Sequence, residues 1–186
     1  MSGSVPAIHS VQFYDTDEGL VHRLCGVVSS GLRIGNSVLI VATKDHRNQL
    51  VKELQRLDVD VRSYAREDRF TICDAEETLS RFMVEGLPDA DLFLASVGKL
   101  VLHAKKAARS KDKGLVIFGE MVAVLWEAGN KTGSLALEKL WNDLLNERAF
   151  HLHCAYPRAL FSHDEAGILN VCENHSHVLG AISRLA

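Results

Sequence analysis

The stretch GLVIFGEMVAVLWEAGN, residues 114–130, contains the strand-to-helix switch that decides the fold of this chain. Its first part, Leu115–Phe118, is a short, continuous apolar run of the kind found in strands covered on both faces. Gly119 ends the run, the acid Glu120 follows, and a helical pattern continues to Asn130. In many nucleotide hydrolases an acid at the end of such a strand holds magnesium. The stretch therefore raises the question of where a phosphate-binding loop would lie.

Strand-like and helix-like segments alternate on both sides of this stretch. We expect strands at 10–14, 37–43, 69–74, 115–118 and 150–156, with helical patterns between them, and one or two short helices over 164–185. Such alternation predicts an α/β fold of three layers, in which a mainly parallel sheet carries helices on both faces. Because we find no repeat, low-complexity tract or linker, we expect residues 1–186 to form a single domain.

Composition and charge exclude several classes of function. The net charge is −3 and no extended basic run occurs, so nucleic-acid binding by a basic face is not supported. No apolar stretch approaches the roughly 20 residues that cross a bilayer, and residues 1–8 lack the pattern of a signal peptide. We therefore expect a cytoplasmic protein without a membrane partner, in which the four widely spaced cysteines are free thiols.

A phosphate-binding loop should lie between the first strand and its helix, in the segment FYDTDEGLVHRL, residues 13–24. This segment has no GK[ST] motif, and the first lysine of the chain is Lys44. It carries Asp15, Asp17 and Glu18 instead, which would repel a triphosphate. The sequence therefore argues against hydrolysis by a P-loop enzyme. Two interpretations of Glu120 stay open: an acid that interacts with a helix dipole, or a residue of a ligand cleft.

Open α/β sheets bind ligands beyond the carboxyl ends of their strands. Tyr14 and Tyr156 each lie at such an end, where a hydroxyl group can address a ligand. Thr43 can cap the helix after the second strand, and His46 lies in the first turn of that helix. Free amides in a first turn can bind an anion, although a plain surface histidine is the simpler interpretation of His46.

Two stretches supply potential metal ligands, HLHC at 151–154 and CENHSH at 172–177. On a strand, His151 and His153 share one face whereas Cys154 takes the other, so these three cannot ligate one ion without a bend. Zinc requires four donors in a tetrahedral array. We therefore expect no metal and no cofactor, but the residues of 151–177 leave the metal question open. A Cys154 nucleophile paired with His175 is a weaker alternative.

Six stretches together resemble one known family. They are HSVQFYDTDEGL (9–20), SVLIVATKDHRNQL (37–50), DAEETLSRFMVEGLPD (74–89), FGEMVAVLWEAGN (118–130), ALEKLWNDLLNERAFHLHCAYP (136–157) and VCENHSHV (171–178). In this order they resemble the MEDS domain, the methanogen/methylotroph, DcmR sensory domain, over about residues 9–178. The segment REDRF, 66–70, departs from the family, which usually has a glycine before the strand.

The resemblance implies a RecA/KaiC-like fold that has lost its phosphate-binding loop and that senses small organic compounds. Carried over by position, it puts eight residues at the presumed cleft: His9, Tyr14, Thr43, His46, Glu120, Asn130, Asn142 and Tyr156. From these we expect a ligand-binding set without catalytic or metal-binding members, namely Tyr14, Thr43, His46, Glu120, Asn130 and Tyr156.

The function expected from residues and resemblance together is that of a non-catalytic sensory or signal-transduction domain. It would bind a small organic ligand or a partner signalling protein. A histidine kinase or a transcription regulator would carry the output, and a homo-oligomer is a further option. The alternative is a RecA-like enzyme that binds or hydrolyses nucleotides with a degenerate phosphate loop.

Overall fold

The computed structural model describes residues 7–110, 112 and 114–180. Within these residues, six strands form one sheet in the order β3-β2-β6-β7-β1-β8, and every neighbouring pair is parallel. The strands are β1 (Ile8–Tyr14), β2 (Ser37–Ala42), β3 (Phe70–Asp74), β6 (Leu115–Gly119), β7 (His151–Pro157) and β8 (His177–Leu179). All carboxyl ends therefore meet at one edge of the sheet.

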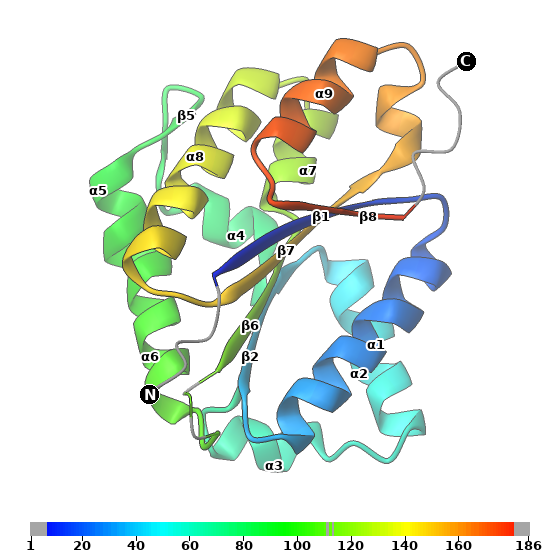
Figure 1. Cartoon of the computed structure of the whole chain (residues 1–186), viewed down its shortest axis with the longest axis vertical. Coiled ribbons are helices and arrows are strands. Elements are labelled where there is room, and N and C mark those ends of the chain that lie inside the picture. Colours follow the sequence, from blue (N-terminus) through cyan, green and yellow to red (C-terminus); the bar gives the residue numbers. More distant parts are fainter. Residues whose placement is uncertain (1–6, 111, 113, 181–186) are drawn as a thin grey trace.

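Helices cover both faces of this sheet (Figure 1). One face carries α1 (Asp17–Arg33) and α2 (Lys44–Arg56), with the short α3 (Val61–Arg66) leading into β3. On the other face lie α4 (Ala75–Ser80), α5 (Ala90–Phe93), α6 (Lys99–Ala107), α7 (Met121–Glu127), α8 (Lys131–Glu147) and α9 (Glu165–Glu173). The expected three-layer α/β fold with a parallel sheet is confirmed. No helix in the described part of the chain is both long and apolar enough to cross a membrane.

The two faces bury separate apolar clusters. All six residues of β2 are buried, as its apolar run predicts, and they contribute to both clusters. Under α1 and α2 the packing is mainly aliphatic, whereas on the other face Trp141 packs edge-on against Phe93 at 5.3 Å between ring centroids. Both tryptophans are core residues, with Trp126 4% exposed and Trp141 0% exposed. The larger cluster surrounds α8, where a group of polar side chains is embedded.

Three segments differ from the sequence-based expectation. The helical spacing of Leu79, Phe82 and Met83 predicts a helix through Met83, but this helix ends at Ser80, and a hairpin of β4 (Met83–Val84) and β5 (Leu87–Pro88) follows. The spacing of apolar residues predicts one long helix from about Asp89, but that stretch contains a π-helical segment, Leu94–Gly98, between α5 and α6.

The expectation of helices alone over 164–185 is wrong, because the chain leaves α9 and adds β8 to the edge of the sheet beside β1. Residues 181–185 lie outside the described part.

Candidate functional site

A polar cluster stands at the carboxyl edge of the sheet and consists of Tyr14, Asp17, Thr43, His46 and Glu120. We refer to it as the edge cluster. The Glu120 carboxylate accepts a hydrogen bond from the Thr43 backbone N–H at 2.8 Å through Oε2 and contacts His46 Nδ1 through Oε1. His46 Nε2 lies 3.3 Å from Asp17, and the Tyr14 ring packs edge-on against the imidazole. Glu120 thus joins the ends of β2 and β6, and His46 links it to Asp17 at the start of α1.

The environment of the edge cluster shifts two pKa values. Burial opposes protonation of His46, but its contacts with Glu120 and Asp17 outweigh that effect and raise the pKa of the imidazole. Burial, and then the charges of Glu120 and Asp17, raise the pKa of the Tyr14 hydroxyl. The cluster therefore favours a cationic His46 between two carboxylates and a neutral Tyr14.

The segment after β1 builds no anion cradle. Thr16 is the N-cap of α1, and its side chain accepts from the Gly19 N–H at 3.2 Å. Asp17 and Glu18 occupy the first turn of the helix. Because Thr43 and His46 occupy both oxygens of Glu120, the acid is a structural link at the edge of the sheet. Thr43 is also the N-cap of α2, but its side chain makes no capping bond.

Asn130 and Tyr156, the other two expected ligand residues, have different surroundings. Asn130 is the N-cap of α8, accepts from the Gly133 N–H at 2.9 Å and donates to the Gly86 carbonyl at 2.6 Å. Tyr156 is fully buried, and its hydroxyl donates to Glu138 at 2.7 Å. The structure brings Tyr14, Thr43, His46 and Glu120 together. It puts Asn130 in a helix cap and Tyr156 in the core, and ligand contact by any of them stays a prediction.

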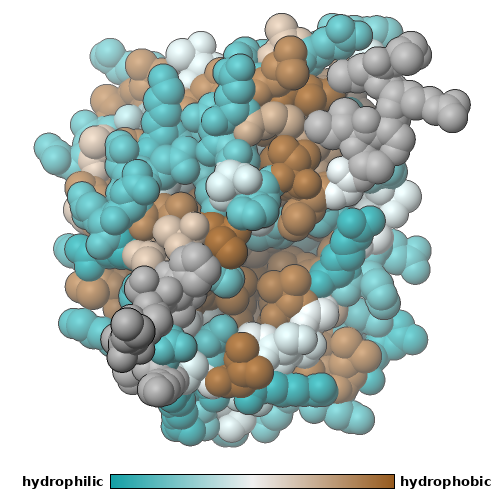
Figure 2. All heavy atoms as spheres, viewed as in Figure 1, coloured by the Kyte–Doolittle hydropathy of each residue, from teal (hydrophilic) through white to brown (hydrophobic). Residues whose placement is uncertain are grey.

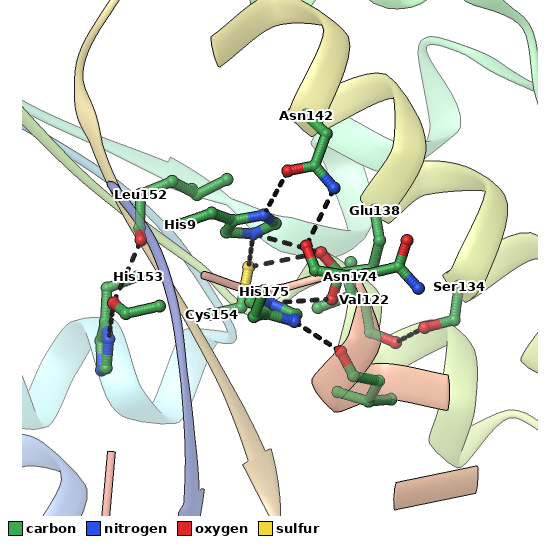
Figure 3. Close-up of polar contacts among 12 residues, drawn as sticks. His9, Val122, Ser134, Glu138, Asn142, Leu152, His153, Cys154, Asn174 and His175 are labelled. Atoms are coloured by element: carbon green, nitrogen blue, oxygen red, sulfur yellow. Dashed lines mark hydrogen bonds and ion pairs between the residues drawn. The ribbon is translucent and has the colours of Figure 1, made fainter. Parts of the chain in front are cut away.

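A second polar cluster, which we refer to as the buried cluster, consists of His9, Glu138, Cys154 and His175 (Figure 3). One potential ligand atom from each lies within 4.8 Å of those of the other three. The four side chains come from β1, α8, β7 and the turn after α9, so they bring together distant parts of the sequence. His9, Glu138 and Cys154 are at most 1% exposed, and the His175 side chain is 0% exposed.

The buried cluster gives no support to a thiol nucleophile. Burial, and then the neighbouring Glu138 carboxylate, raise the pKa of Cys154 well above its ordinary value, so the reactive thiolate is disfavoured. Burial lowers the pKa of His175 more than Glu138 raises it. Burial also raises the pKa of Glu138, but His175, His9 and Tyr156 together lower it by more. The set does match the ligand types of a borderline metal ion such as zinc.

A cavity of about 420 Å³ lies between the middle of α1 and the strands β7, β1 and β8, and we refer to it as the β1 groove. Figure 2 shows this hollow, with hydrophobic side chains at its border. Its apolar lining consists of Ile8, Leu24, Val27, Val116, Leu152 and Leu179. Its polar lining consists of Ser10, Gln12, Arg23, His151 and His153. The volume falls in the range of small-molecule sites.

The polar wall of the β1 groove is a short hydrogen-bonded chain. His153 Nδ1 lies 3.0 Å from Ser10 Oγ, and His153 Nε2 lies 3.2 Å from Gln12 Oε1. Burial, and then the neighbouring His175, His9 and Arg23 side chains, lower the pKa of His153 to about 4, so the imidazole is neutral at pH 7. The other terminal atom of Gln12, Nε2, is buried and has no hydrogen-bond partner among the described residues. An amide donor without a hydrogen-bond partner therefore lies buried within the wall of the groove.

Sequence reasoning missed Glu138, Gln12 and Arg23. For Glu138 a signal was present: it stands among Ser134, Leu137 and Trp141 on the inward stripe of α8, where a charge has to find a partner. The interpretation of the strand 151–154 is confirmed, because His151 and His153 line the groove whereas Cys154 faces α8. The fold also brings His175 close to Cys154. The two histidine-rich stretches were compatible with this proximity but did not predict it.

Comparison with known proteins agrees with this architecture. No curated protein matches the sequence significantly. Among solved structures, an uncharacterized protein from Pyrococcus horikoshii, crystallised in complex with an unknown peptide, is similar over 95% of this chain and 78% of that chain. Its TM-score is 0.62 and its identity 16%, so the likeness concerns the fold alone. The model of the MEDS family matches residues 8–176, which is nearly the whole chain. The chain therefore belongs to the MEDS family, the methanogen/methylotroph, DcmR sensory domain.

Proposed function

We propose that this sensory domain binds a small organic ligand in the β1 groove and performs no catalysis. The observation that carries the proposal is the buried amide donor of Gln12, which has no partner in the wall of a mainly apolar cavity. A buried donor without a partner costs about 1–3 kcal/mol, and a ligand acceptor would remove that cost. The site is concave and apolar with a few convergent polar groups, as small-molecule sites are.

The lining selects a chemical class of ligand. Gln12 Nε2 offers a donor, and the exposed guanidinium of Arg23 adds a positive charge at the border of the cavity. His153 is neutral at pH 7 and already engages Ser10 and Gln12. The preferred ligand is therefore a small molecule with an apolar body and an acceptor or anionic head, for example a short-chain carboxylate.

The groove is connected to the edge cluster through α1. Arg23 belongs to α1, whose first residue Asp17 contacts His46 at 3.3 Å. A smaller cavity of about 240 Å³ shares Gln12 and Arg23 with the groove and extends to Tyr14. A ligand that favours one position of α1 relative to β8 would shift the equilibrium between two packings of these elements. The edge cluster would then report the shift to a histidine kinase, a transcription regulator or a second copy of the chain.

The non-catalytic part of the proposal rests on the edge of the sheet. The first turn of α1 is acidic and capped by its own threonine, which disfavours a bound triphosphate. Glu120 is engaged by Thr43 and His46. Measured ATP turnover by the purified chain that is lost in Glu120→Gln would contradict this part.

Ligand binding is tested with a defined series of probes. Straight-chain carboxylates of increasing length, and the alcohols of matching length, are added to the purified chain at millimolar concentration, and the melting temperature is measured. A ligand that binds only the folded state raises this temperature. We expect the carboxylates to raise it more than the alcohols, and the effect to grow with chain length until the groove is filled.

Variants locate the binding site. Gln12→Glu keeps the size of the side chain but replaces the free donor with an acceptor, so we expect the shift by carboxylates to disappear. Gln49→Glu changes charge by the same amount in a different cavity, between α1 and α2, and serves as the matched control. The proposal fails if no probe shifts the wild-type chain, or if Gln12→Glu responds like Gln49→Glu.

A further inference from the structure

We propose that the buried cluster of His9, Glu138, Cys154 and His175 is a structural zinc site. The proposal concerns the other face of the sheet and does not depend on the β1 groove. It rests on three observations: the distances between the donor atoms, the orientation of the two imidazoles, and a buried nitrogen without a partner.

The distances agree with one tetrahedral ion. His9 Nε2 lies 3.4 Å from Cys154 Sγ and 3.3 Å from Glu138 Oε2, and these last two atoms are 3.8 Å apart. His175 Nε2 lies 3.5 Å from Glu138 Oε1. In a tetrahedral zinc site with bonds of about 2.0–2.3 Å, neighbouring ligand atoms are about 3.3–3.8 Å apart. Three donor atoms, from His9, Glu138 and Cys154, therefore have the spacing of ligands of one ion, and the four potential ligand atoms all lie within 4.8 Å of one another.

Hydrogen bonds outside the cluster orient both imidazoles. His9 Nδ1 is 2.8 Å from Asn142 Oδ1, and the amide group of Asn142 is itself fixed because Nδ2 donates to the Asn174 carbonyl. His175 Nδ1 is 2.7 Å from the Val171 carbonyl. Since both acceptors require a proton on Nδ1, the Nε2 lone pairs of the two neutral rings point into the cluster (Figure 3). Metal-ligating histidines are held by such bonds at their second nitrogen.

The carboxylate is prepared in the same way. Glu138 Oε1 accepts from the Tyr156 hydroxyl at 2.7 Å, and Tyr156 is in turn 3.3 Å from Ser134 Oγ. Oε2 is the oxygen that faces His9 and Cys154. Glu138 can therefore bind an ion through Oε2 while Tyr156 holds its other oxygen.

His175 Nε2 bears on whether a metal ion or a proton occupies the centre of the cluster. This atom is buried and has no hydrogen-bond partner among the described residues. One added proton would pair only one of the two rings with Glu138, because His9 Nε2 lies 3.3 Å from Oε2 and His175 Nε2 lies 3.5 Å from Oε1. A zinc ion accepts electron pairs from all four residues. With one thiolate and one carboxylate the centre is also electrically neutral, which suits an apolar core.

The site would fasten the end of the chain to the sheet. His175 follows α9 and precedes β8, whereas His9, Glu138 and Cys154 belong to β1, α8 and β7. The four side chains would fill every position of a tetrahedral ion and leave none for a substrate. All four are also buried, which is the arrangement of a structural rather than a catalytic site.

Metal content of the wild-type chain is the first test. The chain is purified without a metal-chelating tag, equilibrated with Zn²⁺ and dialysed, and zinc is measured by elemental mass spectrometry. We expect about one zinc ion per chain. With Co²⁺ in place of Zn²⁺, we expect the intense visible bands of a tetrahedral site together with a thiolate-to-cobalt charge-transfer band. A wild-type chain that retains no metal, or whose Co²⁺ spectrum is that of the hydrated ion, overturns the proposal.

Matched variants assign the ligands. Cys154→Ser is compared with Cys172→Ser, and His175→Gln with His177→Gln, because Cys172 and His177 lie nearby but outside the cluster. We expect Cys154→Ser and His175→Gln to weaken zinc binding by at least about tenfold and the two controls to leave it unchanged. Equal affinity in a variant and its control would remove that residue from the site. Circular dichroism checks that each chain is folded, and the cobalt spectrum of the wild-type chain decides the matter if a variant is not.

Discussion

The imidazole of His46, in the first turn of α2, contacts the carboxylate of Glu120, which follows β6, and the contact joins two strands at their carboxyl ends. The same carboxylate accepts from the Thr43 N–H at 2.8 Å. Both side chains are largely buried, with His46 7% exposed and Glu120 2% exposed. This relationship gives Glu120 a structural task in a position where a nucleotide hydrolase would keep an acid for magnesium.

We predict that Glu120→Gln destabilises the chain. The substitution keeps the size of the side chain but replaces a charged acceptor of two contacts with a neutral amide. Bonds to charged groups contribute about 1.5–3 kcal/mol, so we expect the free energy of unfolding near pH 6 to fall by about that amount. Urea denaturation followed by circular dichroism measures it. Glu127→Gln, at an exposed position of α7, is the control and should change stability little. Equal stability of the two variants would show that the contact contributes nothing.

From the raised pKa of His46 we predict that the free energy of unfolding depends on pH. Its pKa in the folded chain lies above the ordinary value of 6.5, because Glu120 and Asp17 favour the charged ring against the opposing effect of burial. The folded state therefore binds the proton more tightly. The resulting stabilisation is fully present below about pH 6.5 and is lost as the pH rises through the folded pKa.

The test compares wild type with His46→Gln in urea at a series of pH values between 5 and 9. We expect the difference in unfolding free energy to be largest at the acidic end and to shrink as the pH rises. His163→Gln, at an exposed position, should show no such trend. A difference that grows with pH would reverse the sign and contradict the assigned charge state.

The edge cluster could be foreseen in part because strand ends are readable from sequence. Tyr14, Thr43 and Glu120 each follow an apolar run, and parallel strands bring such ends to one edge. Glu138 was not foreseen because periodicity marks a position as inward-facing without naming its partners, which come from β1, β7 and the turn after α9. The β1 groove could not be predicted because it depends on how α1 packs against β1, β7 and β8, which is a property of the tertiary structure.

Local signals also explain two of the three differences from the expected fold. β8 has only three residues, all exposed, so it lacks the buried or alternating pattern that identifies a strand. The β4–β5 hairpin turns at Glu85 and Gly86, with φ of 50° and 81°, although glutamate is not a residue that marks such a turn. In both places pairing with a neighbour overrides weak local preference.

We predict that Tyr156→Phe weakens the zinc site without removing a ligand. The variant loses the hydroxyl that donates to Glu138 Oε1 at 2.7 Å. Loss of such an outer contact typically lowers metal affinity about 10–100-fold, and we expect a value in this range from competition with a chromogenic chelator. Tyr64→Phe is the control, because the Tyr64 ring packs under Arg69 and lies against the apolar cluster on the other face of the sheet. Unchanged affinity in Tyr156→Phe would mean that Glu138 needs no support from Tyr156.

We predict that removal of zinc loosens the segment from α9 to β8. Ser176, next to the ligand His175, exchanges hydrogen bonds with the His9 backbone at 2.8 Å and 3.1 Å, so the ion and these bonds hold the same junction. Hydrogen exchange of the zinc-loaded and the chelated chain should therefore differ most in residues 171–179. Strand β2 provides an internal reference that should stay protected. A Cys154→Ser chain should show no effect of chelator, and uniform loosening of the whole chain would contradict a local role.

The β4–β5 turn offers a test of backbone conformation that leaves every polar cluster untouched. Glu85 and Gly86 both have positive φ, which is the pattern of a type I′ turn, where Asn-Gly is preferred. Glu85→Asn should therefore stabilise the chain by up to about 1 kcal/mol, whereas Gly86→Ala should destabilise it by about 1 kcal/mol or more. Thermal and urea denaturation measure both. Asn130 bonds the Gly86 carbonyl in either variant, so zinc content and ligand shifts should stay as in wild type. If Glu85→Asn lowers stability instead, the turn does not have the conformation described.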